Sequence, residues 1–296
     1  MKKMPKVESF MNEYKLSLKV LKTEEFFDLV LFRPLAFMLV KGVARTRITP
    51  NQITFLSVVV FIVAARMIAT AMPGMVLWAG ILIAAGNVLD CADGQLTRVK
   101  GNGTQYGRIL DGIGDYISAI AFFIAIGYWG LSQSVEPMIW WPITGATMVS
   151  YGWQSTLVDF HRNEFIGRMN GTSDFVGAEL KETRNELIRV RNAGGSVLEK
   201  FVLSIYLYFS SVQARIQPGN RLEIGTQKYI RSNARIIRFW CLNGSATSRF
   251  LLMVACLLNR IELFVVYVLI VGTIWSISLL GFQMAIDRKL RKGERS

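Results

Sequence analysis

The chain has 296 residues, 52% of them hydrophobic, and a formal net charge of +13 at pH 7. A mean hydropathy of +0.35 together with this charge is unusual for a soluble domain and typical of a membrane protein with Lys/Arg-rich cytoplasmic loops. The basic residues alternate with long apolar segments, which argues against a nucleic-acid-binding domain. Three cysteines and one histidine share no metal-ligand spacing, so a disulfide framework and a histidine-based zinc site are excluded.

Residues 1–48 are predicted to form a cytoplasmic arm followed by a helix in the membrane interface. The arm, 1–22, is polar and of mixed charge, and it lacks the apolar core of a signal peptide. The segment 24–43 is apolar, but charged side chains interrupt it too often for a membrane span: Asp28, Arg33 and Lys41. This pattern favours an amphipathic helix that lies in the interface.

Six apolar segments are predicted to cross the membrane, because a span needs about 20 mostly apolar residues. Thr49 and Pro50 provide the N-cap and the first residue of the first span. The spans are expected at 51–72, 75–96, 104–130, 137–159, 248–258 and 263–286. They form two blocks, 49–162 with four spans and 246–296 with two spans and a basic tail. The fold class is therefore an all-α integral membrane protein.

The segment 163–245 is predicted to be a cytoplasmic or interfacial helical insertion between spans four and five. Three helical pieces are expected in it, at 179–191, 196–216 and 229–240. The apolar run between Lys200 and Arg215 is only about 14 residues long, which favours an interfacial helix over a span. With this assignment both termini and all Lys/Arg-rich loops share one side, which the positive-inside rule places in the cytoplasm.

Four aspartates stand out because they interrupt two of the long apolar runs. Asp90 and Asp93 end the second predicted span, and Asp111 and Asp115 begin the third. Spacings of three and four residues place each pair on one face of its helix. Ionised carboxylates at membrane depth persist only when they pair, face water or hold a cation, and hard divalent cations prefer oxygen ligands. The sequence therefore predicts a divalent-metal site at the cytoplasmic end of these spans.

The same stretch resembles the signature of the CDP-alcohol phosphotransferases, integral-membrane enzymes of phospholipid synthesis. The pattern is Asp-x-x-Asp-Gly-x-x-Thr-Arg, eight residues, then Gly-x-x-x-Asp-x-x-x-Asp, from Asp90 to Asp115. Thr97 departs from the family, which usually has alanine there. Thr49-Pro50-Asn51 also resembles an element that many members carry before their first span, although a plain helix start explains these residues equally well.

The resemblance implies an enzyme that cleaves a CDP-alcohol, commonly CDP-diacylglycerol, and transfers the phosphoalcohol to a second hydroxyl with release of CMP. It implies a two-metal site for Mg²⁺ or Mn²⁺ with four ligands: Asp90, Asp93, Asp111 and Asp115. Asp115 is also the implied general base. The implied nucleotide contacts are Gly94, Thr97, Arg98 and Gly107. For Arg98 alone, a membrane-surface anchor is the alternative to a diphosphate partner.

The acceptor stays open at this point. A phosphorylated acceptor needs further cations beside the cluster, and four basic residues are candidates for this role, although they could equally determine topology: Arg108, His161, Arg162 and Arg168. A small polar alcohol or its phosphate is favoured, and a CDP-choline or CDP-ethanolamine type of enzyme with a diacylglycerol acceptor is the alternative within the family.

Two readings from other classes are a divalent-cation transporter that uses the Asp cluster and an inactive scaffold. The acidic residues stop at the cytoplasmic end of the spans, which disfavours a transport pathway across the membrane. The expected partners are the CDP-alcohol donor, the hydroxyl acceptor and membrane lipids, without nucleic acid. Because family members are often homodimers, the resemblance also implies self-association. The expected location is the cell membrane, with the site and both termini on the cytoplasmic side.

Overall fold

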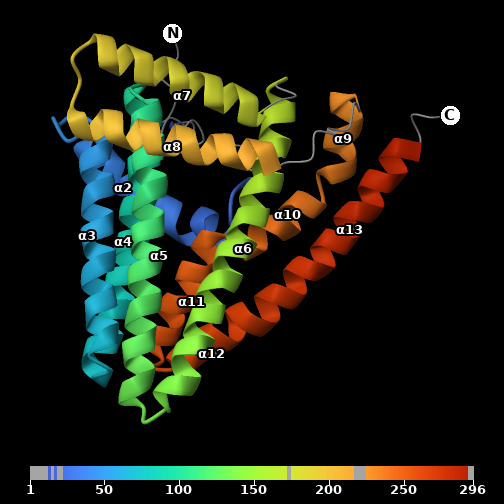
Figure 1. Ribbon diagram of the computed structural model, residues 1–296. Coiled ribbons are helices and arrows are strands. Elements are labelled where there is room, and N and C mark those ends of the chain that lie inside the picture. Colours follow the sequence, from blue (N-terminus) through green and yellow to red (C-terminus); the bar gives the residue numbers. More distant parts are fainter. Residues whose placement is uncertain (1–12, 15–16, 19–22, 172–174, 217–224, 293–296) are drawn as a thin grey trace, which may run out of the picture.

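The computed structural model describes residues 13–14, 17–18, 23–171, 175–216 and 225–292. These ranges are almost entirely helical and contain no strand, which confirms the predicted all-α class. Long helices run side by side as a bundle, and two further helices lie across one end of it (Figure 1).

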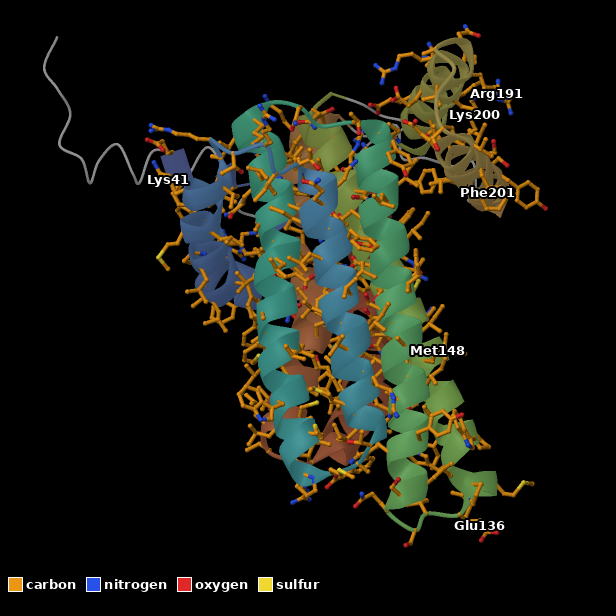
Figure 2. All side chains as sticks on the ribbon, turned by 90° about the vertical axis from the view of Figure 1, so that its left-hand side faces the viewer. Lys41, Glu136, Met148, Arg191, Lys200 and Phe201 are labelled. Atoms are coloured by element: carbon orange, nitrogen blue, oxygen red, sulfur yellow. The ribbon has the colours of Figure 1, made fainter. Side chains whose placement is uncertain are left out.

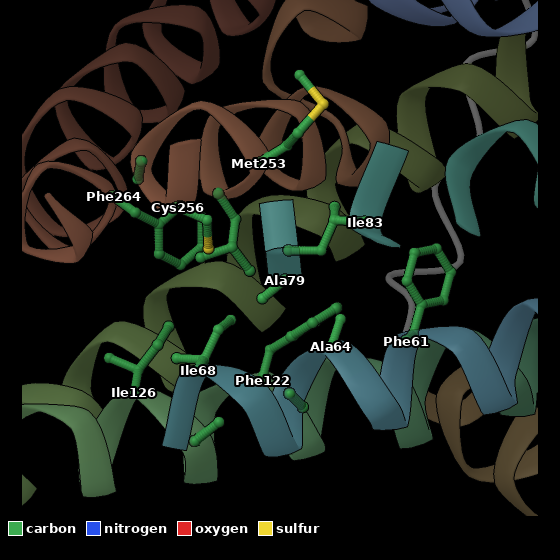
Figure 3. Close-up of a cluster of buried hydrophobic side chains, with 14 of the residues drawn as sticks. Phe61, Ala64, Ile68, Ala79, Ile83, Phe122, Ile126, Met253, Cys256 and Phe264 are labelled. Carbon is green, nitrogen blue, oxygen red and sulfur yellow. The ribbon is translucent and has the colours of Figure 1, made fainter. Parts of the chain in front are cut away.

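The centre of the bundle is built from α3 (Pro50–Ala69), which packs against both α4 (Pro73–Lys100) and α5 (Gln105–Ser132), and from α11 (Ser245–Leu257), which packs on α4. Figure 3 shows the buried core between them. Its side chains come from all four helices and from α12 (Ile261–Val266), and include Phe61, Ile83, Phe122, Cys256 and Phe264. This core fixes the relative position of α4 and α5, which carry the four aspartates.

Within the described residues, four stretches of helix are long and apolar enough to cross a membrane: α3, α4, α5 and Ile261–Leu290. The predicted spans at 51–72, 75–96 and 104–130 therefore coincide with helices, to within a few residues at each end. The predicted spans at 137–159 and 248–258 correspond to α6 (Pro137–Met169), which is long but less apolar, and to α11, which is apolar but short.

Helix α6 continues ten residues beyond the predicted end of span four, as far as Met169. The extension is held by packing, because Phe165 is fully buried and the His161 ring stacks on Trp240 with centroids 4.5 Å apart. Trp240 belongs to α10 (Ile236–Trp240), so the insertion covers this part of α6.

The last predicted span is not one regular helix. It consists of α12, a π-helical turn η4 (Tyr267–Gly272) and α13 (Thr273–Lys292). The Gln154 side chain of α6 donates to the carbonyl oxygen of Val268 at 2.8 Å, and a Cβ on Gly272 would lie only 2.4 Å from the Gln154 Oε1. Such an inserted polar side chain is a common companion of a π turn. The hydropathy pattern alone could not indicate it.

In the insertion, α7 (Phe175–Asn192) and α8 (Val197–Ile216) form an antiparallel pair that lies across the start of α5 (Figure 1). Leu187, Val190 and Leu203 pack on Ile109 of α5. In Figure 2 the labelled Arg191 and Lys200 lie at one end of the bundle, together with Lys41, and Glu136 lies at the other. The predicted helices at 179–191 and 196–216 are therefore present, four and one residues from their expected starts.

The third predicted piece, 229–240, is wrong as a single helix. The structure has α9 (Thr226–Asn233) and α10, separated by a turn, followed by the short η3 (Cys241–Asn243). The Asn233 side chain donates through Nδ2 to the Tyr229 carbonyl oxygen at 3.0 Å, and its Oδ1 accepts from the Gln283 side chain at 2.8 Å. Asparagine side chains that bond to nearby backbone compete with helix continuation, which explains the break.

The N-terminal segment forms η2 (Asp28–Phe32) and α2 (Arg33–Val43), so the helix predicted at 24–43 is present. Its first residues are tied down by an ion pair of 2.7 Å between Arg33 and Glu24, whose side chains are 7% and 4% exposed. Gln95 of α4 donates to the Arg33 carbonyl oxygen at 3.2 Å. The segment therefore packs beside the C-terminal end of α4, near the aspartates.

Gly130 offers a test of the packing between α5 and α6. A Cβ at this position would lie 1.8 Å from the Trp140 Nε1, and that nitrogen donates to the Ile126 carbonyl oxygen at 3.0 Å. Gly130→Ala should therefore displace the indole and lower stability by about 1–3 kcal/mol. Gly145→Ala on α6 is the matched control, since its Cβ meets nothing within 4 Å. Thermal unfolding in detergent should show a lower midpoint for Gly130→Ala alone; equal midpoints would contradict this packing.

Candidate functional site

The four aspartates come from two helices, α4 and α5, as the sequence predicted, and α3 packs on both. Asp93 is the most buried of the four, at 5% exposure, and accepts a hydrogen bond of 2.5 Å from the Thr54 hydroxyl of α3. Asp90, Asp111 and Asp115 are partly exposed. Three helices thus meet at the acidic cluster, and α3 contributes a hydroxyl that orients one carboxylate.

A residue that the sequence reasoning missed joins the two helices. Arg249 of α11 donates to Asp90 at 2.8 Å and to Asp115 at 2.5 Å, and its side chain is 11% exposed. Asp90 and Asp115 therefore converge on one guanidinium group. The signal was present in the sequence, because Arg249 is a lone cation near the start of an apolar segment, and such residues usually face a functional interior.

A small cavity adjoins this arrangement, with a volume of ≈ 20 Å³. That is room for roughly one water molecule and far too little for a sugar or a nucleotide. The polar residues that line it are Asp115, Ser118, Tyr151, Ser248 and Arg249. Because Asp115 lines this cavity and its side chain is also 40% exposed, the carboxylate lies at the boundary between the buried interior and the open side of the cluster.

The predicted nucleotide contacts lie at the α4–α5 turn and beside α3. A Cβ on Gly107 would lie 3.0 Å from the Asn51 Oδ1, so this glycine lets the starts of α3 and α5 approach closely. Likewise, a Cβ on Gly103, in the turn between α4 and α5, would lie 3.0 Å from the methyl carbon of Thr97. The structure therefore brings the Thr-Pro-Asn element next to Gly107, although the two are far apart in sequence.

Arg98 does not point away from the protein as a surface anchor would. Its Nε donates to the Ser17 carbonyl oxygen, its guanidinium lies 3.5 Å from where a Cβ of Gly94 would be, and its Nη2 is buried with no partner. Arg98 and Ser17 also line a cavity of ≈ 250 Å³ between the arm, α2 and the end of α4. The predicted contact of Arg98 with a diphosphate stays a prediction.

The four cations that the sequence offered for an acceptor phosphate all have partners elsewhere. Arg108 pairs with Glu182 of α7 at 2.7 Å, and Arg162 pairs with Asp159 at 2.9 Å. Arg168 pairs with Glu164 and covers the Tyr229 ring. His161 stacks on Trp240, as described above. None of these contacts is with the aspartate cluster, whereas Arg249 lies inside it.

The start of α11, and with it Arg249, is held from the N-terminal segment. The Glu25 carboxylate, 3% exposed, accepts from the Thr247 backbone amide at 2.7 Å and from its hydroxyl at 3.1 Å. The helix has no side-chain cap of its own, because its N-cap is Gly244. A Cβ there would lie 2.2 Å from the Glu25 Oε1. Glycine is thus required for the close approach of a capping group that is distant in sequence.

Glu25 should make stability depend on pH. Burial is the main cause that raises the pKa of its carboxyl to about 7 from 4.5, and the charge of Asp28 adds to it. Arg162 and the amides of Ala246 and Thr247 act in the opposite direction. Because the folded state holds the Glu25 proton more tightly, the contribution of Glu25 to the free energy of unfolding is fully present below pH 4.5. It is lost as the pH rises through about 7.

Glu25→Gln removes this titration and keeps an oxygen that can accept from Thr247. Relative to the wild type, the variant should gain stability between pH 4.5 and pH 7, on the order of 3 kcal/mol at most, and the gain should be constant above pH 7. Thermal unfolding of both proteins across this range checks it, with Glu24→Gln as the neighbouring control. A stability difference that does not change with pH would contradict the raised pKa.

Magnesium or manganese fits the chemistry of the acidic cluster, because its donors are carboxylate oxygens, two of which already converge on a shared cation. In the described part of the chain, no group of three or more His, Cys, Asp or Glu side chains is gathered closely enough to hold a metal ion. The carboxylates have protein partners instead, among them Thr54 and Arg249. Metal ligation by the four aspartates therefore stays a prediction.

Comparison with known proteins gives matches over this region. Residues 47–163 match the family model of CDP-alcohol phosphatidyltransferase. A phosphatidylinositol phosphate synthase of Corynebacterium glutamicum is 35% identical over 101 residues, which are 34% of this chain and 43% of that protein. The matched part is therefore less than half of that relative.

An archaetidylinositol phosphate synthase of Pyrococcus horikoshii is 27% identical over 186 residues, which cover 62% of this chain and 91% of that protein. A bifunctional IPC transferase and DIPP synthase of Thermococcus kodakarensis is 24% identical over 176 residues, which are 58% of this chain and 34% of that protein. The family match includes all four aspartates and the turn between them, so the predicted resemblance is confirmed. Residues 47–163 are thus similar to the CDP-alcohol phosphatidyltransferase family.

Proposed function

We propose that this protein transfers the phosphatidyl group of CDP-diacylglycerol to a hydroxyl of an inositol phosphate and releases CMP. The donor follows from the family, and the acceptor class from relatives named as phosphatidylinositol phosphate and archaetidylinositol phosphate synthases. The enzyme is thus a transferase of phospholipid synthesis, and its acceptor carries a phosphate of its own.

The observation that best supports a phosphorylated acceptor is the position of Arg249. A nearly buried guanidinium that touches both Asp90 and Asp115 supplies positive charge inside an otherwise acidic site. Arginine side chains bind phosphate through two parallel N–H donors. In Arg249, the Nε is a further buried donor that has no hydrogen-bond partner. An acceptor with a phosphate would satisfy these donors, while diacylglycerol offers only a neutral hydroxyl.

In the reaction, the acceptor hydroxyl oxygen attacks the phosphorus that bears the diacylglycerol. The bond from this phosphorus to the bridging oxygen breaks, and CMP leaves with that oxygen. Asp115 accepts the hydroxyl proton, for which it must lie within hydrogen-bond reach of the attacking oxygen. Its position beside Arg249 supports this role, because a phosphate held by Arg249 keeps the sugar close to the Asp115 carboxylate.

The residues that would hold two Mg²⁺ or Mn²⁺ ions are Asp90, Asp93, Asp111 and Asp115. Bound there, the ions would neutralise the diphosphate and stabilise the CMP leaving group. The remaining chemistry belongs to the chain. Thr54 orients Asp93 through its hydroxyl, and Gly107 lets Asn51 at the start of α3 lie close to the start of α5.

We also propose six spans, with α6 and α11 crossing the membrane beside the four long apolar helices. Outward-facing side chains on α6 support this, since Val149 is 73% exposed on the outer face of the bundle. The basic residues Lys41, Arg191 and Lys200 share one end (Figure 2), which the positive-inside rule assigns to the cytoplasm. The aspartate cluster then lies near the cytoplasmic surface, where a soluble inositol phosphate can reach it. Self-association stays a prediction.

The first experiment is a CMP-release assay with purified protein in lipid nanodiscs, with magnesium and then manganese. CDP-diacylglycerol is offered with inositol phosphate, inositol, glycerol phosphate, serine or diacylglycerol in turn. We expect metal-dependent release with inositol phosphate, and little with inositol, which differs only in the phosphate. Arg249→Gln should remove this preference for the phosphorylated acceptor.

Other results would contradict the proposal. Equal rates with inositol and inositol phosphate would remove the role of the acceptor phosphate. Release only with diacylglycerol, from CDP-choline or CDP-ethanolamine, would place the protein in the other branch of the family. No release with any pair, together with metal-dependent cation flux in liposomes, would favour transport.

A further inference from the structure

We propose that Glu25 is a positioning residue for the acceptor: it caps the first turn of α11 from the N-terminal segment and thereby fixes the direction in which Arg249 enters the site. This inference rests on the proposed function, because it assigns Arg249 to the acceptor phosphate. Glu25 itself touches neither substrate, so its effect should be specific to acceptor binding.

The geometry begins with the exposed amides at a helix start. The first amides of a helix have no partner within the helix, and a side-chain oxygen normally satisfies one of them. In α11, Gly244 and the first turn provide no such oxygen and no acidic residue. Glu25 takes this role, because its carboxyl oxygen accepts two hydrogen bonds from Thr247.

A second contact fixes the same face of α11. Phe250 stacks on Phe27 with ring centroids 3.8 Å apart and an interplanar angle of 12°, and Phe32 packs edge-on against it. Residues 247 and 250 are three apart and therefore share a helical face, which is turned towards the N-terminal segment. Arg249 projects from a different face, towards α4 and α5, where it reaches Asp90 and Asp115.

The cap is therefore close to Arg249 in the chain but does not touch its side chain. Gly244 supports the cap, because any side chain there would collide with the Glu25 carboxylate. Cys241, just before this turn, contacts the Thr23 carbonyl oxygen at 3.4 Å. The N-terminal segment thus holds the whole entry into α11, and loss of the cap should let the first turn and the guanidinium move.

The test compares Glu25→Ala with Glu25→Gln and with Glu24→Ala in the nanodisc assay. Glu24 is the matched control, because it is the adjacent buried carboxylate and pairs with Arg33 of α2. Loss of a helix cap corresponds to roughly 10-fold in an equilibrium constant. We expect Glu25→Ala to raise the KM for inositol phosphate by about 10-fold. The KM for CDP-diacylglycerol and kcat should stay within about 3-fold of the wild type, since Glu25 touches neither the donor nor the reacting atoms.

Glu25→Gln should restore the acceptor KM, because its amide oxygen can accept from Thr247. Thr247→Val keeps the amide bond and loses only the hydroxyl bond, so it should give a smaller rise in the acceptor KM. This variant is useful if Glu25→Ala does not fold. Hydrogen exchange of the α11 amides gives a readout independent of activity, and Glu25→Ala should speed exchange in the first turn of that helix.

The outcomes separate the two proposals. If the wild type transfers to inositol phosphate but Glu25→Ala and Thr247→Val both leave its KM unchanged, the role of Glu25 is wrong and the proposed function stands. A fall in kcat with equal rises in both KM values would mean general damage and would also overturn this role. If the wild type does not use a phosphorylated acceptor, the proposed function fails, and the role of Glu25 fails with it.

Discussion

Asp115→Asn should retain binding of CDP-diacylglycerol and lose transfer. A general base contributes typically about 10²–10⁴-fold to rate, and asparagine cannot accept the hydroxyl proton. The substitution also weakens the contact with Arg249, which is 2.5 Å in the native protein. We therefore expect kcat to fall by at least about 100-fold while the donor still binds.

The matched control is Asp159→Asn, which removes the same charge from a carboxylate paired with Arg162 outside the cluster. Donor binding is measured by calorimetry in nanodiscs, and transfer by CMP release. Transfer at the wild-type rate would eliminate Asp115 as the base.

Asp93→Asn should abolish turnover through loss of metal binding. Asp93 is the most deeply buried of the four aspartates, and asparagine can still accept the Thr54 hydrogen bond, so the local packing is preserved. Even residues that only orient metal ligands cost roughly 10–100-fold when they are changed, so removal of a ligand should cost at least about 100-fold. Titration with Mn²⁺ should show weaker metal binding in the variant.

Thr54→Val provides a graded comparison, because it removes the hydroxyl that orients Asp93 but leaves the carboxylate. Its loss of activity should be smaller, roughly 10-fold, and excess metal should partly restore it. Normal metal affinity in Asp93→Asn would disprove its assignment as a ligand. Lost activity with normal metal affinity in Thr54→Val would assign the hydroxyl to substrate binding instead.

The aspartates illustrate what spacing in a sequence can predict. Asp90 and Asp93, and likewise Asp111 and Asp115, each lie on one helical face by periodicity alone, and the apolar runs around them predict helices long enough to span a membrane. The family signature follows from the same positions. None of these inferences needs a contact between segments that are far apart in the chain.

Arg249 illustrates what spacing could not predict. Four other cations near the predicted loops were equally good candidates by sequence, and whether a cation pairs with a local carboxylate or reaches the cluster is decided by packing. Arg162 and Arg168 pair within one turn of their own helix, whereas Arg249 is directed at Asp90 and Asp115 because α11 packs on α4.

The sequence by itself determined the helical class, the membrane character and the two pairs of aspartates, because these depend on composition and on periodicity within one helix. Only the tertiary structure decided which cation enters the cluster, that Thr54 orients Asp93, and that Glu25 caps α11 across 222 residues of chain. Such contacts join helix ends whose local sequence carries no record of their partner. They form because buried polar groups must find partners wherever the apolar packing of the helices places them.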